Sequence, residues 1–159
     1  MVSQPIDRLH ELGYELPAAP APMASYVPTR LVPIGEGRGL LYIAGQVAMK
    51  DGRLITGRVT SEVGVEQAQE AARSCALNIL AQIDAAVGLD KVIEVAQLIG
   101  WVLSDNDFDG QPQVINGASD LLVGVLGDAG KHARAAVGTN SLPRGVTVEI
   151  AATVHVRVR

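Results

Sequence analysis

The stretch KVIEVAQLIGWVL, residues 91–103, is a nearly continuous apolar run that is rich in β-branched residues. A run of this length and composition is typical of a buried strand, and we expect it to be covered on both faces. Gly88 comes shortly before the run, and a polar loop with three aspartates, residues 104–110, comes after it. The run therefore predicts an interior strand with other parts of the protein packed above and below it.

A helix is predicted on each side of this strand. From about residue 61 to residue 87, apolar residues recur at spacings of three and four and form one stripe, which consists of Ala68, Ala72, Cys75, Ile79, Ile83 and Val87. Gly88 ends this helix, since glycine tolerates a left-handed cap. A second helix is predicted from about residue 111 to residue 126. Because Cys75 lies in the apolar stripe, we interpret it as a small core residue rather than a reactive thiol.

Four further strands are predicted near the two ends of the chain. Residues 25–34 and 40–48 form a pair that is joined by the glycine-rich segment 35–39, and a turn follows at residues 50–52. Residues 132–139 and 146–158 form the last two strands. The final strand alternates: one face carries Val148, Ile150, Ala152, Val154, Val156 and Val158, and the other carries Glu149, Ala151, Thr153, His155 and Arg157.

This order of elements predicts an α+β fold in which a mixed sheet carries two helices on one face. The other face has no helix to cover it, which indicates that another copy of the chain covers it. Residues 5–12 are predicted to form a short helix, and the proline-rich segment 17–22 to form an extended connector. We therefore expect an N-terminal extension over residues 1–23 and one domain over residues 24–159.

Composition narrows the class of protein. The formal net charge is −4 and no Lys/Arg-rich stripe occurs, so nucleic-acid binding is disfavoured. Cys75 is the only cysteine and the three histidines lack the spacing of metal ligands, so we expect no disulfide and no metal site. No apolar run approaches the length of a membrane span, and the charged first residues lack the apolar stretch of a secretory signal, so we expect no export. These features predict a cytoplasmic protein without membrane attachment.

Two charged residues are candidates for chemistry. Arg134 shares a strand face with Ala136 and Gly138, and such small neighbours leave room for a carboxylate beside its guanidinium, which can bind one with two parallel hydrogen bonds. Glu149 interrupts the last strand, where partial burial would raise its pKa and let it position or activate a water. A surface arginine in a structural ion pair and a solvated glutamate are the alternative interpretations.

The segment ARAAVGTNSLPRGVTVEIAATV, residues 133–154, resembles the C-terminal signature of the RidA/YjgF family of reactive-intermediate (enamine/imine) deaminases, which has the older label endoribonuclease L-PSP. The resemblance rests on Arg134, the turn Leu142-Pro143 and the triplet at residues 148–150, with the interval from Arg134 to Glu149 preserved. Tyr26, the tripeptide Ala44-Gly45-Gln46 and Asn116 also fall where the family has similar residues. The resemblance covers about residues 24–158.

The resemblance implies a chorismate-mutase-like fold, a homotrimer and sites in the clefts between subunits. It implies that Arg134 clamps the substrate carboxylate and that Glu149 holds a water, which attacks the imine carbon and releases ammonia and a 2-keto acid. Tyr26, Asn116, Ala44, Gly45 and Ala136 would line the cleft. The resemblance implies no metal and no organic cofactor.

Two departures from the family pattern bear on activity. Many members carry Ser where this chain has Ala44 and Cys where it has Ala136. A lost neutral hydrogen bond costs about 0.5–1.5 kcal/mol, whereas each charged bond of an arginine is worth about 1.5–3 kcal/mol. The departures therefore predict an altered rate or substrate preference, with carboxylate binding kept. A non-catalytic protein that binds 2-keto acids is the alternative function, and an endoribonuclease is a third that the acidic charge and the few aromatic residues disfavour.

Overall fold

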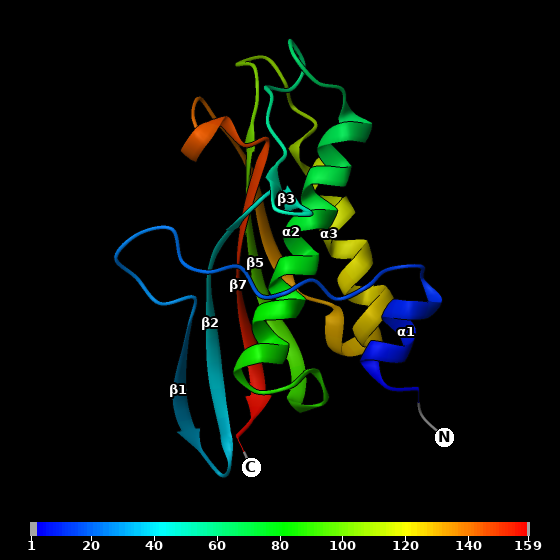
Figure 1. Ribbon diagram of the computed structural model, residues 1–159, viewed down its shortest axis with the longest axis vertical. Helices are drawn as coiled ribbons and strands as arrows, with labels where there is room; N and C mark the ends of the chain where they lie inside the picture. Colours follow the sequence, from blue (N-terminus) through cyan, green and yellow to red (C-terminus); the bar gives the residue numbers. More distant parts are fainter. Residues whose placement is uncertain (1–2, 159) are drawn as a thin grey trace.

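The computed structural model describes residues 3–158, in which helices pack on one side of a long sheet (Figure 1). The helices are α1 (Pro5–Glu11), α2 (Val65–Ala86) and α3 (Gln111–Leu126). The strands are β1 (Thr29–Gly35), β2 (Arg38–Val47), β3 (Met49–Lys50), β4 (Arg53–Leu54), β5 (Val92–Leu103), β6 (Ala133–Thr139) and β7 (Val148–Arg157). Short 3₁₀ turns occur at Leu89–Lys91, Gly127–Gly130 and Pro143–Gly145. No helix among the described residues is both long and apolar enough to cross a membrane.

The main sheet has the strand order β1-β2-β7-β5-β6. β5 and β6 run parallel to each other, and the other neighbouring pairs are antiparallel. Since β2 and β5 are both antiparallel to β7, they run in the same direction, and α2 and α3 form two successive crossover connections between parallel strands. Such crossovers place their helices on the same face of the sheet. The predicted mixed sheet with two helices on one face is confirmed.

The core lies between this sheet and the two long helices. On β7, the residues that alternate toward the helices are buried: Val148, Ile150, Val154 and Val156 have no exposed surface, and Ala152 has little. Glu149, Ala151, Thr153 and His155 are half-buried on the opposite face. The predicted alternation of β7 is therefore confirmed. Cys75 is also fully buried, and this burial raises the pKa of its thiol and keeps it in the neutral form.

The expectation that residues 91–103 are covered on both faces is wrong for the single chain. Leu98 and Val102 are fully buried against the helices, but Ile99 and Trp101 on the other face stay half-buried. That face also exposes Tyr42 and Val137. The strand therefore has two apolar faces. One packs against the helices, and one copy of the chain leaves the other open to solvent.

The described residues before position 24 pack onto the helices. Leu9 of α1 is fully buried, and Arg8 Nε donates a 2.6 Å hydrogen bond to the Val125 carbonyl of α3. The connector then crosses α2, where Gln82 Nε2 donates to the Pro20 carbonyl at 2.7 Å (Figure 1). Where the sequence predicts only a turn at residues 50–52, β3 and β4 form a small hairpin beside this crossing. Strands of two residues leave no periodic pattern in a sequence.

Candidate functional site

Arg134 lies on β6, half-buried beside the first half of α3. Its Nη1 donates hydrogen bonds to Asn116 Oδ1 at 2.9 Å and to Ser119 Oγ at 3.1 Å. Its Nη2 donates to the Pro112 carbonyl at 3.1 Å. All three acceptors belong to α3. Positions 112, 116 and 119 are three and four residues apart, so they lie on the same face of this helix, the face that meets β6. The guanidinium is therefore held in one orientation.

The acceptors around Arg134 carry no formal charge. Among residues 3–158, no carboxylate lies within ion-pair distance of this guanidinium. An arginine has five N–H donors, and the three bonds above leave Nε–H and one Nη2–H without an acceptor in the described chain. Nε and Nη2 form one edge of the guanidinium, the kind of edge that binds a carboxylate with two parallel bonds. The site thus keeps both a positive charge and free donors.

His132 and Ser119 extend this hydrogen-bond chain. His132 Nδ1 lies 2.6 Å from the Gly130 carbonyl, and Nε2 lies 2.8 Å from Ser119 Oγ. A carbonyl only accepts, so Nδ1 carries a proton, and Nε2 shares a second hydrogen bond with the Ser119 hydroxyl. The hydroxyl then presents its lone pairs to Arg134. His132 therefore orients Ser119, and Ser119 orients Arg134.

Glu149 lies on β7 with its carboxylate above the backbone of Gly45. A Cβ at position 45 would come within 2.6 Å of Glu149 Oε2, so any side chain there would force the carboxylate to move. The pairing of β2 with β7 is irregular between Ile43 and Gln46, and this irregularity brings Ala44 and Gly45 beside Glu149. Burial raises the pKa of Glu149 above its ordinary value of 4.5. Burial thus favours the protonated form of this carboxyl group relative to an exposed glutamate.

A cavity of about 240 Å³ lies next to Gly45. Tyr26, Gln46 and Arg144 line it, together with the proline-rich segment that leads into β1. Tyr26 is held by its own loop, since its hydroxyl accepts a 3.1 Å hydrogen bond from the Met23 amide. Arg144 is exposed, with a left-handed backbone at φ 54° in the turn before β7. Tyr26 and Gly45 therefore border this cavity, and Gly45 also lies against the Glu149 side chain.

The predicted site residues fall into two separate groups within one chain. Arg134, Asn116 and Ala136 belong to β6 and α3, whereas Ala44, Gly45 and Glu149 lie at the irregular pairing of β2 with β7, and Tyr26 lines the cavity next to Gly45. The strand register places Arg134 and Glu149 on opposite faces of the sheet: Leu98 pairs with Arg134 and faces the helices, and Trp101 pairs with Glu149 and faces away. A single copy therefore does not bring Arg134 and Glu149 together.

Sequence reasoning missed three contributors to these groups: Ser119, His132 and Arg144. Two of them left a signal, because His132 shares the strand face of Arg134 and Ser119 lies one helical turn from Asn116. Arg144 left none, since it lies in a turn without periodicity. Among the described residues, His, Cys, Asp and Glu do not gather in threes that could hold a metal ion.

Known proteins resemble this chain along nearly its whole length. Residues 6–150 match the family described as "YjgF/chorismate_mutase-like, putative endoribonuclease". Protein TCP17 of Trypanosoma cruzi is 42% identical over 150 residues, which cover 92% of this chain and 91% of that protein.

Solved structures share the fold. The protein Atu1372 of Agrobacterium tumefaciens, of unknown function, is 46% identical, with a TM-score of 0.85 over 96% of this chain and 92% of that one. RidA from the Antarctic bacterium Psychrobacter is 25% identical, with a TM-score of 0.59 over 87% of this chain and 94% of that one. The matched family covers both groups of residues described above. The chain belongs to the YjgF/chorismate mutase-like family, whose members include the RidA proteins.

Proposed function

We propose that this protein hydrolyses reactive 2-imino acids and their 2-enamino tautomers to 2-keto acids and ammonia. An enamine first takes a proton on its β-carbon and becomes an iminium ion. The oxygen of a water then bonds to the iminium carbon, and a proton passes from that water to the nitrogen. The carbon–nitrogen bond then breaks with its electron pair on nitrogen as the carbon–oxygen double bond forms, and the second proton of the former water passes from that oxygen to the nitrogen. One water and one iminium ion thus give one keto acid and one ammonium ion.

The observation that carries this proposal is the uncompensated guanidinium of Arg134. Arg134 is oriented by three uncharged acceptors and keeps two free N–H donors. That arrangement suits a carboxylate that arrives from solution. In the proposed complex, the substrate carboxylate binds Nε and Nη2 of Arg134, and Asn116 lies beside it.

Glu149 is the proposed general base. Its half-buried carboxylate has a raised pKa, and no ion pair with another described residue holds it in the charged form. A base of this kind takes a proton from water more effectively than an ordinary surface glutamate. It can return the proton to the departing nitrogen. Gly45 and Tyr26 border the space in which the water and the imine carbon would lie.

Arg134 and Glu149 act on one substrate only if they come from different copies of the chain. We therefore propose a homotrimer in which Arg134 of one subunit faces Glu149 of the next. The open face of the sheet supports this assembly, because Tyr42 and Val137 are 47% and 43% exposed there and Trp101 is half-buried beside them. An exposed apolar surface of this kind is typical of an interface between copies.

Ala44 and Ala136 are proposed to change the rate of the reaction, while the binding of the substrate carboxylate is kept. Neither side chain offers a hydrogen bond, so the substrate is held by Arg134 and by backbone groups near Gly45. Because each charge-assisted bond is worth about 1.5–3 kcal/mol, the two bonds to Arg134 outweigh the lost neutral contacts. We expect the space freed beside Ala136 to admit larger substrate side chains.

The test generates imines with an amino-acid oxidase and follows their decay by semicarbazone formation. We expect the wild type to accelerate the decay, and Arg134→Ala to lower kcat/KM by at least about 100-fold, as the loss of two charged bonds predicts. Arg53→Ala, which removes an exposed arginine of β4, is the matched control and should keep full activity. Saturable 2-keto acid binding without turnover would instead identify a metabolite-binding protein.

A further inference from the structure

A second, larger cavity lies on the helix side of the molecule, between the N-terminal connector, the β3–β4 hairpin and α2. Its volume is about 660 Å³, within the range of cavities that bind small organic ligands. Tyr14 and Leu16, just before the connector, Met49 of the hairpin and Leu77 of α2 supply apolar walls. Each of these four side chains is half-buried, so part of its apolar surface faces the cavity.

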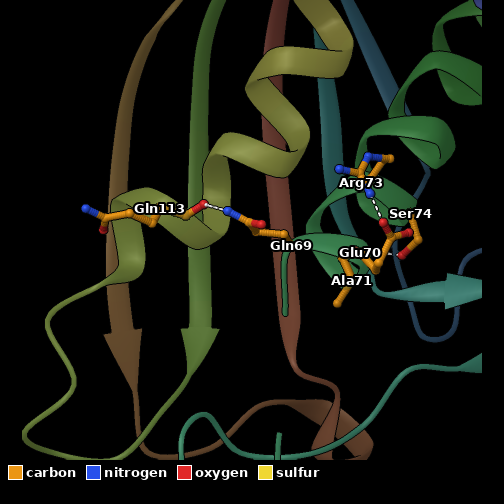
Figure 2. Close-up of polar contacts among 6 residues, drawn as sticks. All are labelled: Gln69, Glu70, Ala71, Arg73, Ser74 and Gln113. Carbon is orange, nitrogen blue, oxygen red and sulfur yellow. Dashed lines mark hydrogen bonds and ion pairs between the residues drawn. The ribbon is translucent and has the colours of Figure 1, made fainter. Parts of the chain in front are cut away.

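One face of α2 supplies the polar groups of this cavity. Glu70, Arg73, Ser74, Leu77 and Asn78 follow one another at helical spacing and line its floor. Figure 2 shows Arg73 reaching toward Glu70, with Ser74 beside them, while Gln69 points the other way to the Gln113 carbonyl of α3. The bond from Gln69 Nε2 to that carbonyl is 2.8 Å long and fixes α2 against α3. The helix face that forms the floor of the cavity is therefore held in place by α3, and its polar side chains face away from the core.

Arg73 is the charged group that matters most inside the cavity. Its side chain is 25% exposed, whereas the Glu70 side chain is 64% exposed and that of Glu15 is 90% exposed. Lys50 and Asp51 also line the rim and are exposed. Water and salt screen the exposed charges far more than a half-buried one. Arg73 bonds to Glu70 through Nη1 alone, so Nε and Nη2 keep donors free among the described residues.

We propose that this cavity is a binding site for an amphipathic carboxylate, with its apolar body between the connector and Leu77 and its carboxylate on Arg73. The apolar walls favour a hydrocarbon or aromatic body, since burying apolar surface releases about 25 cal/mol per Å². The guanidinium selects the carboxylate through two parallel bonds. Glu70 turns into solvent when the ligand takes its place, which costs little because an exposed ion pair is weak.

This site is separate from the one that contains Arg134 and Glu149. Arg73 and Leu77 are on α2 beneath the connector, whereas Arg134 is on β6 and bonds only to α3. The inference does not rest on the proposed deaminase activity. The ligand proposed for this cavity binds through its apolar body as well as its carboxylate. The small carboxylates proposed for Arg134 need no such apolar body.

Isothermal titration calorimetry of the full chain with decanoate tests this proposal. We expect one saturable site per chain, with decanoate binding more tightly than 1-decanol or decylammonium. Arg73→Gln should weaken decanoate binding at least about tenfold, as the loss of charged hydrogen bonds predicts. Arg38→Gln is the matched control, because Arg38 forms a comparable ion pair with Glu36 away from the cavity and should leave binding unchanged.

A second variant tests the location of the apolar body. Leu77→Trp fills the cavity and should abolish binding, and thermal melting shows whether it folds. Arg134→Ala should bind decanoate like the wild type. The proposal is overturned by the absence of saturable decanoate binding, or by equal affinities of Arg73→Gln and Arg38→Gln. Tighter binding of decylammonium than of decanoate would also overturn it.

Discussion

Arg134 and Glu149 extend from opposite faces of the same five-stranded sheet. Arg134 lies toward the helices, where α3 orients it, and Glu149 lies toward the open face above Gly45. Two groups placed in this way cannot contact one small molecule from within one chain. The proposed reaction therefore depends on a second copy that brings an Arg134 to each Glu149, and several measurements follow from that dependence.

The charge of Arg134 can be cancelled without changing the shape of its surroundings. Asn116→Asp puts a carboxylate 2.9 Å from Nη1, in place of the amide oxygen that now accepts its hydrogen bond. A permanent ion pair competes with the substrate carboxylate, so we expect kcat/KM to fall at least about tenfold while thermal stability stays equal or rises. Asn106→Asp, in the exposed loop before α3, is the control for added charge. Unchanged kcat/KM in Asn116→Asp would contradict a substrate-binding role for Arg134.

Gly45→Ala tests the placement of the Glu149 carboxylate. The new methyl group would meet Oε2 at 2.6 Å, and Glu149 must turn away. We expect kcat to fall at least about tenfold, since positioned proton transfer contributes about 10²–10⁴ to a rate. Gly64→Ala is the matched control, because a Cβ there meets no atom within 4 Å and its φ is −86°. Steady-state kinetics of the two variants would refute the placement if both kept the wild-type kcat.

The raised pKa of Glu149 has a consequence for stability. Because burial raises this pKa in the folded chain, the folded state binds more protons than the unfolded state between the two values, and stability falls as pH rises through that window. Glu149→Gln removes this effect. We therefore expect Glu149→Gln to melt at a higher temperature than the wild type at pH 7, with the difference shrinking below pH 4.5, the ordinary value. A difference that is independent of pH would show that burial does not perturb this group.

The open face of the sheet offers a direct test of assembly. Val137 is 43% exposed there, and Val137→Glu places a charge where a second copy would have to bury it. We expect sedimentation to give three chains for the wild type and one for Val137→Glu, with a loss of deaminase activity of at least about tenfold. Val27→Glu, in the loop before β1, adds the same charge at a residue that is 59% exposed. An active, monomeric Val137→Glu would rule out the shared cleft.

Periodicity was sufficient to predict the elements that pack on one another. The spacing from Ala68 to Ile83 predicted the buried stripe of α2, and the alternation from Val148 to Val156 predicted which face of β7 meets the helices. Both patterns arise because a long regular element repeats the same contact many times. The order of these elements then predicted a mixed sheet with both long helices on one face.

Features set by single contacts were not predictable in this way. The apolar run at residues 91–103 does not say whether Trp101 is covered by its own chain or by another, since burial by either favours the same residues. The orientation of Arg134 depends on where α3 lies against β6, and the Pro112 carbonyl that holds it carries no side-chain signal. The closeness of Gly45 and Glu149 depends on an irregular strand pairing. Register of that kind is fixed by packing rather than by residue pattern.

Complementation between inactive variants tests the shared cleft most directly. Arg134→Ala and Glu149→Gln are produced together with two different affinity tags, and trimers that carry both tags are purified. A cyclic trimer of mixed composition contains one cleft with an intact Arg134 and an intact Glu149, so we predict about one third of the wild-type deaminase activity from two nearly inactive parents. Mixed trimers no more active than their parents would contradict a site built from two copies of this chain.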